Sequence, residues 1–379
     1  MNTKKSGSKS SIINIVCLVL LAVGIFAWSR ELAGNPGTTN LSEYAPWGLY
    51  IALFLFFEAL CAGTLFIAAL GSNNLPRLKM AVIGTVSGVC AGIAILPDLG
   101  SPLTVWRLLF APNTSAPMIL DVWFLGLTVV FGILLILGLS GNKEGLTRLS
   151  RIVLPIVTIL LPLGTAWLFT TLPGKVGWSS SLEIGVFIAQ AALAGLCVLF
   201  ILQGIAKNVA NITSKLVLAF LLINLALIIG EVGQALYSSG IEALPTKALL
   251  RGGFAPIFWC QVILGVIIPS ILLAMNKSPL IAGVLSLLGV VITKYLFVVK
   301  GNIYPFLNIG ESLVVPELGA GNEGYLMAPT YVPSGFEWLV GIGVFALGVL
   351  LINLLLPRVT NKQVGVINII QDINQIGVN

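Results

Sequence analysis

The chain has 379 residues, of which 57% are hydrophobic and 9% charged, with a net charge of +6 and no histidine. Soluble domains usually carry about 25% charged residues, so this composition excludes a soluble protein and predicts an integral membrane protein. Histidine is the usual ligand of b-type haem and of most zinc and copper sites, so its absence argues against a di-haem cytochrome b anchor. The positive charge is explained by basic residues placed around a membrane, and no nucleic-acid partner is expected.

Ten apolar runs are each long enough to cross a bilayer, which takes about 20 residues. The first run follows three lysines but precedes no A-x-A cleavage pattern, so it is interpreted as a helix and not as a signal peptide. The sequence therefore predicts an all-α integral membrane protein with ten transmembrane helices at 11–29, 46–71, 80–97, 118–140, 151–172, 181–206, 214–239, 254–275, 279–299 and 335–357.

Basic residues gather at alternate ends of the predicted helices. One set of ends carries 13 of the 20 lysines and arginines. Because basic residues favour the cytoplasmic side, both termini are expected in the cytoplasm. Two long loops, about 30–46 and 300–334, then lie outside. The second loop contains Glu311, Glu317 and Glu323, and its length indicates an outward partner protein.

The five cysteines fall inside apolar runs, and no two have CxxC spacing. They are interpreted as small buried side chains and not as cluster ligands. We therefore expect no redox cofactor bound by this chain alone.

A faint internal repeat relates two parts of the sequence. Ala62–Gly63 aligns with Ala194–Gly195, which sets Glu58 opposite Gln190. The same alignment puts Trp47 one residue from the position of Trp178. The predicted organisation is an N-terminal tail, first helix and outer loop (1–45), a first four-helix bundle of helices 2–5 (46–175), a second of helices 6–9 (176–300), and a long loop, last helix and tail (301–379).

Four ionisable residues lie in or near the predicted spans, namely Glu58, Asp98, Glu231 and Lys294. A charge at the bilayer centre costs roughly 2.5–3.5 kcal/mol, so each needs a function or a partner. Buried carboxyl groups that exchange protons are typical of proton relays and quinone sites. The alternative is structural, with a carboxylate paired to a lysine or Lys294 extending toward the interface.

Glutamines occur in the same helices. Gln234 follows Glu231 by three residues, so the two share a helix face. Such amides bridge acids through water or join helices by hydrogen bonds. The candidate proton pathway comprises Glu58, Asp98, Gln190, Glu231, Gln234 and Lys294.

The stretch ILPDLGSPLTVWRLLFAPNTSAPMILDVWFL holds the densest polar and aromatic group, with Asp98, Arg107, Asp121 and Trp123. A quinone head group needs hydrogen-bond partners and an aromatic wall at membrane depth, which this group supplies. The ordinary alternatives are an Asp98–Arg107 pair that holds the loop and an interfacial aromatic belt.

Four segments together resemble a known family. They are PWGLYIALFLFFEALCAG, DLGSPLTVWRLLFAPNTSAPM, GGFAPIFWCQVILGVIIP and YVPSGFEWLVGIGVFALG, in this order across helices 2 to 10. The sequence resembles the haem-free membrane subunits of the polysulfide reductase/NrfD type. Its ten-helix length and Tyr-x-Pro-Ser…Glu-Trp ending resemble the longer branch, which includes membrane subunits of periplasm-facing hydrogenase and alternative complex III.

The resemblance implies two four-helix bundles flanked by one helix on each side. It also implies an outer iron–sulfur partner of the four-cluster type, a catalytic partner such as a hydrogenase or molybdopterin enzyme, and a quinone site. Trp47, Gly63, Asp98, Gly100, Arg107 and Trp123 match positions around that site. With Glu58 added, the candidate quinone-binding residues are Trp47, Glu58, Asp98, Arg107 and Trp123. Glu337 and Trp338 match the last-helix motif, and Glu337 joins the candidate proton pathway.

We therefore expect a membrane anchor subunit of a respiratory oxidoreductase in a bacterial or archaeal cytoplasmic membrane, without activity of its own. It would exchange electrons between the iron–sulfur protein and menaquinone or ubiquinone in anaerobic respiration, with proton translocation. The sequence departs from many relatives, with Gly164-Thr165-Ala166 for a Tyr-Thr-Gly stretch and Lys294 for an arginine. Short-branch relatives also carry a histidine on the first bundle helix, and this chain has none. The missing tyrosine and histidine favour an alternative, a quinone-independent anchor that joins a hydrogenase-type module to a terminal reductase while its acids conduct protons. A secondary transporter is the alternative from another class.

Overall fold

The computed structural model describes residues 3–42, 45–72, 74–99, 102–110, 116–172, 175–238, 240–303 and 331–376. Gly100 and the loop acids Glu311, Glu317 and Glu323 lie outside these ranges. The described residues form helices and turns and contain no strand. Ten of the described helical segments are long and apolar enough to span a membrane, which confirms the predicted fold class and helix count.

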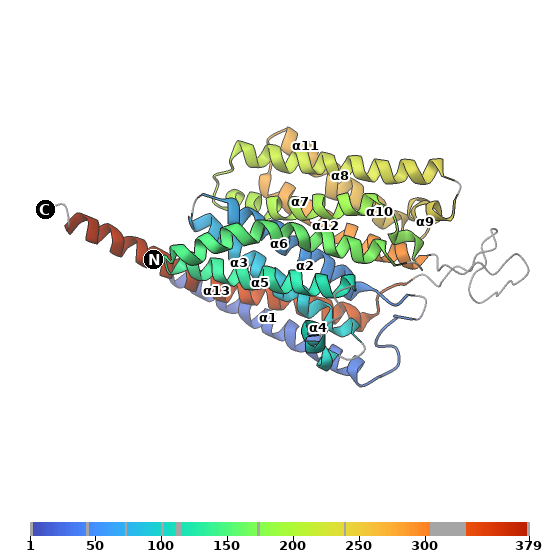
Figure 1. Ribbon diagram of the computed structural model, residues 1–379, viewed down its shortest axis with the longest axis horizontal. Helices are drawn as coiled ribbons and strands as arrows, with labels where there is room; N and C mark the ends of the chain where they lie inside the picture. Colours follow the sequence, from blue (N-terminus) through green and yellow to red (C-terminus); the bar gives the residue numbers. More distant parts are fainter. Residues whose placement is uncertain are drawn as a thin grey trace, which may run out of the picture.

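The spanning helices run roughly parallel, and the described termini lie at one end of the bundle (Figure 1). The helices are α1 Thr3–Leu32, α2 Leu49–Leu70, α3 Asn74–Ala94, α5 Pro117–Ser140, α6 Glu144–Thr170, α7 Leu182–Ile205, α8 Asn211–Tyr237, the continuous run of α10 Ala255–Val262, η5 Ile263–Ile267 and α11 Ile268–Ala274, then α12 Pro279–Ile303 and α13 Gly335–Ile376.

Short elements gather at the other end of the bundle, which we call the α9 end (Figure 1). They interrupt the loops between spans and hold polar residues near the helix ends. They are η1 Leu96–Asp98, η2 Pro102–Thr104, α4 Trp106–Phe110, η3 Val176–Trp178, η4 Ile241–Ala243 and α9 Leu244–Arg251.

Helix α2 lies at the centre of the molecule. It packs against α3 and α6 of the first half (46–175) and against α7 and α12 of the second half (176–300). Its approach to α7 is close because Gly63 lies against Ala191 and Gly195, where an added Cβ would come within 2.8 Å of the Gly195 amide nitrogen. Small residues at such crossings let membrane helices touch backbone to backbone. The two positions aligned by the sequence repeat therefore meet at the α2–α7 crossing.

The first and last spans lie together and do not flank the molecule on opposite sides, as the resemblance implied. α1 packs along α13, and α13 in turn packs on α3. Gly24 and Gly343 allow this close contact, since a Cβ at Gly24 would lie 2.8 Å from the Gly343 Cα. The other α1 face exposes a stripe of large apolar side chains, as expected for contact with lipid.

Several predicted helix ends were wrong because hydropathy marks only the apolar part of a helix. α6 begins at Glu144 and not at 151, and α3 begins at Asn74 and not at 80. α13 continues past Pro357 to Ile376 and projects beyond the other helices (Figure 1). These additions are polar helical turns outside the apolar core.

Candidate functional site

A cavity of about 160 Å³ lies in the first half near the α9 end, between α2, α3, α5 and α6. We call it the first cavity. Its walls are mainly apolar, and they include the rings of Trp47 and Phe169. Two carboxyl groups, Asp98 and Asp121, complete the lining. It therefore combines an aromatic wall with two acids at the edge of the membrane span.

Local structure aims both acids into the first cavity. Pro97 follows the end of α3, and Asp98 lies in the 3₁₀ turn that results. Its Oδ1 atom is buried and has no hydrogen-bond partner among the described residues. Asp121 lies in the second turn of α5 and accepts a hydrogen bond of 2.5 Å from the Thr165 hydroxyl of α6. Asp98 is therefore available to a ligand, whereas Asp121 is already oriented.

An aromatic cluster closes the side of the first cavity that faces the second half. Trp47 stacks on Trp178 with ring centroids 5.3 Å apart, and Phe169 meets both indoles edge-on at 5.1 Å. Phe297 of α12 packs edge-on against Phe169 at 5.0 Å. The Trp178 indole donates a hydrogen bond of 2.8 Å to the Phe297 carbonyl oxygen, which fixes the cluster in place.

The backbone of Trp47 is also held from the end of α12. The Asn302 side-chain amide donates a hydrogen bond of 2.6 Å to the Trp47 carbonyl oxygen. Asn302 in turn accepts a 3.3 Å bond from the Lys175 ammonium group. Burial lowers the pKa of Lys175 to about 8. One wall of the first cavity thus depends on contacts with the end of α12.

Glu58 lies below the first cavity. It shares the α2 face of Ile51 and Phe54, which line the cavity, and stands four residues, about 6 Å, past Phe54. Its side chain is 1% exposed, and neither carboxyl oxygen has a hydrogen-bond partner among the described residues. It lies close enough to Asp121 and Lys294 for electrostatic interaction. Glu58 therefore lies between Asp121 of the first cavity and Lys294 of the second half.

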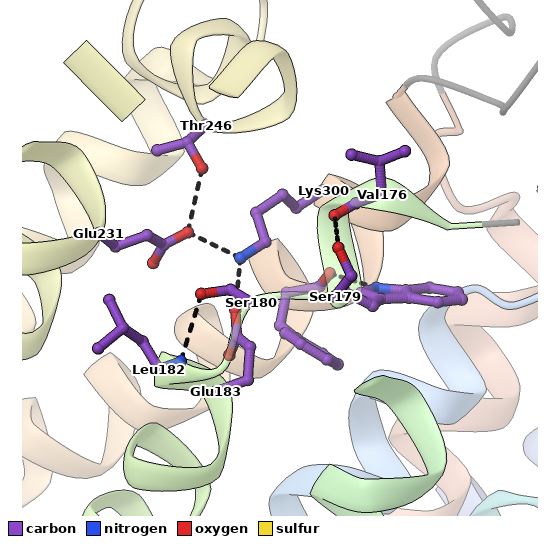
Figure 2. Close-up of polar contacts among 10 residues, drawn as sticks. Val176, Ser179, Ser180, Leu182, Glu183, Glu231, Thr246 and Lys300 are labelled. Carbon is purple, nitrogen blue, oxygen red and sulfur yellow. Dashed lines mark hydrogen bonds and ion pairs between the residues drawn. The ribbon is translucent and has the colours of Figure 1, made fainter. Parts of the chain in front are cut away.

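A second cavity of about 50 Å³ lies in the second half, between α7, α8, α10 and α12. Four charged residues, Glu183, Glu231, Lys294 and Lys300, line it among apolar side chains. The Lys300 ammonium group donates to Glu183 at 2.5 Å and to Glu231 at 2.7 Å. The Thr246 hydroxyl donates a 3.1 Å bond to Glu231 from the other side. Figure 2 shows Lys300 between the two carboxylates, which makes an ion triad of Lys300, Glu183 and Glu231.

Lys294 lies deeper in the same cavity and is 1% exposed, so it does not extend to the interface. Its ammonium nitrogen stands 3.4 Å from the centroid of the Phe187 ring, a cation–π contact. Gln190 lines this cavity too, and its Oε1 atom is buried without a partner among the described residues. Both are therefore polar groups available to water inside the membrane span.

A polar vestibule of about 340 Å³ adjoins the second cavity at the α9 end. It is lined by serines of the η3–α7 connection and by the exposed Gln234. Glu231 and Lys300 line both the vestibule and the second cavity. The ion triad therefore stands between the two spaces.

Three predicted site residues lie elsewhere. Arg107 is exposed on α4 and stacks over Trp106, and the ion pairs between described residues do not include one with Asp98. Trp123 follows Asp121 by two residues, so it points away from the first cavity.

The third of these residues, Glu337, sits in a loop cradle. It accepts hydrogen bonds from the Thr39 and Tyr331 hydroxyls and from the Asn40 and Ser334 amides, at 2.5–3.1 Å. Burial and the bond to Glu337 raise the pKa of Tyr331.

Sequence reasoning left Glu183, Lys300 and Thr165 out of the site. Glu183 stands in the first turn of its helix and Lys300 in the last turn of another, where such charges are common because they suit the helix dipole. The sequence feature that could have identified them is their position relative to the apolar spans. Both lie within an apolar span but close to its end, with Glu183 one residue and Lys300 three residues inside the boundary.

Comparison with known proteins gives three related proteins. The chain is 27% identical over 392 residues to a dimethyl sulfoxide reductase membrane subunit of Halobacterium salinarum, covering 89% of this chain and 88% of that protein. It is 25% identical to a selenate reductase subunit of Mesobacillus selenatarsenatis (90% and 92% covered). It is also 25% identical to an Hdr-like menaquinol oxidoreductase integral membrane subunit of Archaeoglobus fulgidus (88% and 89% covered).

These relatives are all named as subunits of oxidoreductases, and each alignment covers nearly the whole chain. The family described as polysulphide reductase, NrfD, matches residues 37–305, from the loop before α2 to the end of α12. That range holds both cavities, the aromatic cluster and the ion triad. The chain is a multi-pass integral membrane protein that belongs to the polysulphide reductase, NrfD, family.

Proposed function

We propose that this chain is the membrane subunit of a respiratory oxidoreductase and that it exchanges electrons with a quinone bound in the first cavity. The observation that carries this proposal is the first cavity itself, where an aromatic wall and two carboxyl groups meet at the edge of the apolar span. Small-molecule sites in membrane bundles combine largely apolar walls with a few polar groups in this way. The menaquinol oxidoreductase relative supports the same assignment.

The residues of the first cavity suit a quinone head group. Such a group carries two electrons and two protons, so its oxygens need proton donors and acceptors. The unpartnered Oδ1 of Asp98 serves one oxygen, and Asp121, oriented by Thr165, serves the other. Trp47 and Phe169 hold the ring plane and exclude water. Menaquinone and ubiquinone both meet these requirements.

Electrons reach the site from partner proteins at the α9 end. An iron–sulfur protein with several clusters docks there, and it connects to a catalytic oxidoreductase subunit such as a hydrogenase or molybdopterin enzyme. The clustering of basic residues at the opposite helix ends supports an outward-facing α9 end and cytoplasmic termini. Exposed apolar side chains lie in and just before α4, namely Leu103, Trp106 and Phe110. They suit contact with lipid or a partner at this end.

Residues 46–175 and 176–300 form two functional halves in this proposal. The first half binds quinone, with Glu58 and Asp98 exchanging its protons. The second half moves protons through Gln190, Glu231, Gln234 and Lys294. Glu337 has a structural role in this account, because four hydrogen bonds already satisfy its carboxylate.

A second candidate function is a quinone-independent anchor whose buried acids conduct protons while electrons stay in the partners. The observation that favours it is the Thr165–Asp121 hydrogen bond, which already engages one oxygen of a carboxyl group that lines the first cavity. The oxidoreductase names of the relatives leave the transporter alternative without support.

The test uses the whole complex purified in detergent, with a fluorescent or radioactive naphthoquinone analogue. We expect one analogue site per complex, and we expect Asp98→Asn to weaken binding about 10- to 100-fold, as for loss of one charge-assisted hydrogen bond worth about 1.5–3 kcal/mol. Glu144→Gln, at the opposite end of the bundle, is the matched control and should bind like the parent. Full catalytic turnover of a complex that neither contains nor binds a quinone would overturn this function in favour of the anchor.

A further inference from the structure

The two cavities occupy equivalent places in the two halves. Phe169, which lines the first cavity, ends the sequence TAWLF, whereas Phe297, which lines the second, ends TKYLF. The two phenylalanines pack against each other across the boundary between the halves. Asp98, in the η1 turn after α3, likewise corresponds to Glu231 of α8, in the related stretches PDLG and GEVG. The second cavity is thus the counterpart of the first.

The alignment of these motifs puts Lys294 where the first half has Ala166. A cationic chain therefore occupies the interior of the second half in place of a methyl group. Lys294 lies close enough to both Glu58 and Glu183 for electrostatic interaction. Glu58 belongs to the first half and Glu183 to the second. Lys294 is thus an ionisable group between acids of the two halves.

The path on the α9 side of Lys294 is also polar. Lys300 stands six residues further along α12, about 9 Å nearer the α9 end, and pairs with Glu183 and Glu231. The second cavity, of about 50 Å³, has room for a few water molecules, since one water needs roughly 10–15 Å³. Gln190 offers them an unpartnered oxygen. The triad then opens on the vestibule.

The direct route between the cavities is closed. Trp47 and Phe169 line the first cavity, Phe187 and Phe297 line the second, and their rings contact one another through the cluster with Trp178. Packed rings supply no donor or acceptor for proton transfer. A proton that leaves the first cavity toward the second half therefore has to pass beneath this cluster, at the level of Glu58 and Lys294.

We infer that Lys294 and the ion triad form the proton-exchange path of the quinone site, which runs from Asp121 and Glu58 through Lys294, Glu183 and Lys300–Glu231 to the vestibule. This inference rests on the proposed function. It states that the second half serves the first cavity and delivers its protons to the same side of the membrane as the docked partner. Oxidation of a hydroquinone releases two protons to this path and two electrons to the iron–sulfur partner, and reduction takes up the same numbers.

The experiment uses the whole complex in liposomes with a quinol analogue and a soluble electron-accepting dye, and a pH indicator in each compartment. In the parent, protons should appear on the α9 side. Lys294→Met and Glu183→Gln should each slow turnover and proton release at least about tenfold, because a lost proton-transfer group costs about 10²–10⁴-fold. Analogue affinity should stay within about twofold, since neither residue lines the first cavity.

Lys277→Met, at the opposite end of the bundle, is the matched lysine control and should behave like the parent. Glu183→Gln keeps its shape and a hydrogen-bond acceptor for Lys300, so it tests the path even if Lys294→Met does not assemble. An analogue that fails to bind the parent complex would refute the proposed function. Two results would overturn the path and leave the quinone site standing, provided that the analogue binds. One is proton release in Glu183→Gln at the parent rate, and the other is proton release on the side opposite the α9 end.

Discussion

Replacing Lys300 by methionine tests the ion triad. The Lys300 side chain is 4% exposed and the Glu183 side chain 5% exposed, and their charged atoms are 2.5 Å apart. Removing one partner of a buried pair leaves an uncompensated charge and costs about 3–5 kcal/mol. Glu231 is a quarter exposed and contributes less, because solvent screens it. We therefore expect a loss near the lower end of this range, about 3 kcal/mol.

The assay is thermal unfolding of the purified complex, followed by reaction of its cysteines with a maleimide dye. Cys61, Cys90 and Cys197 are free and buried, so they react only on unfolding. Lys300→Met should unfold well below the parent, and adding Glu183→Gln should restore part of the loss because it removes the stranded charge. A Lys300→Met variant within about 0.5 kcal/mol of the parent, the range of ordinary surface substitutions, would show that the triad is not formed.

Three further predictions concern the α2–α7 crossing, the outer loops and pH. Gly63→Ala should cost about 1–3 kcal/mol by overpacking the crossing, whereas Gly126→Ala, whose Cβ meets open space, should match or exceed parent stability in the same assay. Glu337→Gln should lower the stability of the protein by about 1–3 kcal/mol and speed proteolysis of the loop before α2, because it weakens four hydrogen bonds. Unchanged proteolysis would contradict the structural role of Glu337. Lys175 titrates near pH 8 in the folded chain and near 10.4 unfolded, so the unfolded state binds more protons between these values and parent stability should rise with pH there. Lys175→Gln should lose that rise, and equal pH slopes for both proteins would refute the lowered pKa.

Much of the fold follows from hydropathy. The ten long apolar runs were expected to be spanning helices, because a backbone in lipid must satisfy its own hydrogen bonds. The helix ends were less predictable, since the polar first turns of α6 and the polar end of α13 resemble loop sequence. The pairing of α1 with α13 depends on Gly24 meeting Gly343, a contact between distant residues that no local pattern encodes.

The candidate site was partly predictable from individual residues that are unusual in a membrane helix. Asp98 stands out because a carboxyl group within a membrane span is costly, and Trp47 because indole side chains favour the membrane interface. Both residues line the first cavity. Arg107 looked like the partner of Asp98 because it is near in sequence, yet α4 carries it to the surface. Glu183 and Lys300 are unremarkable one at a time, and only tertiary packing brings them together.

Photolabelling asks directly whether a quinone binds in the first cavity. The whole complex would be irradiated with an azido-naphthoquinone, and the labelled peptides identified by mass spectrometry. We predict label in peptides that contain Trp47–Phe54 or Met118–Leu125, competed by unmodified quinone. Label confined to the lipid-facing helix α8, or label that excess quinone does not displace, would contradict the claim.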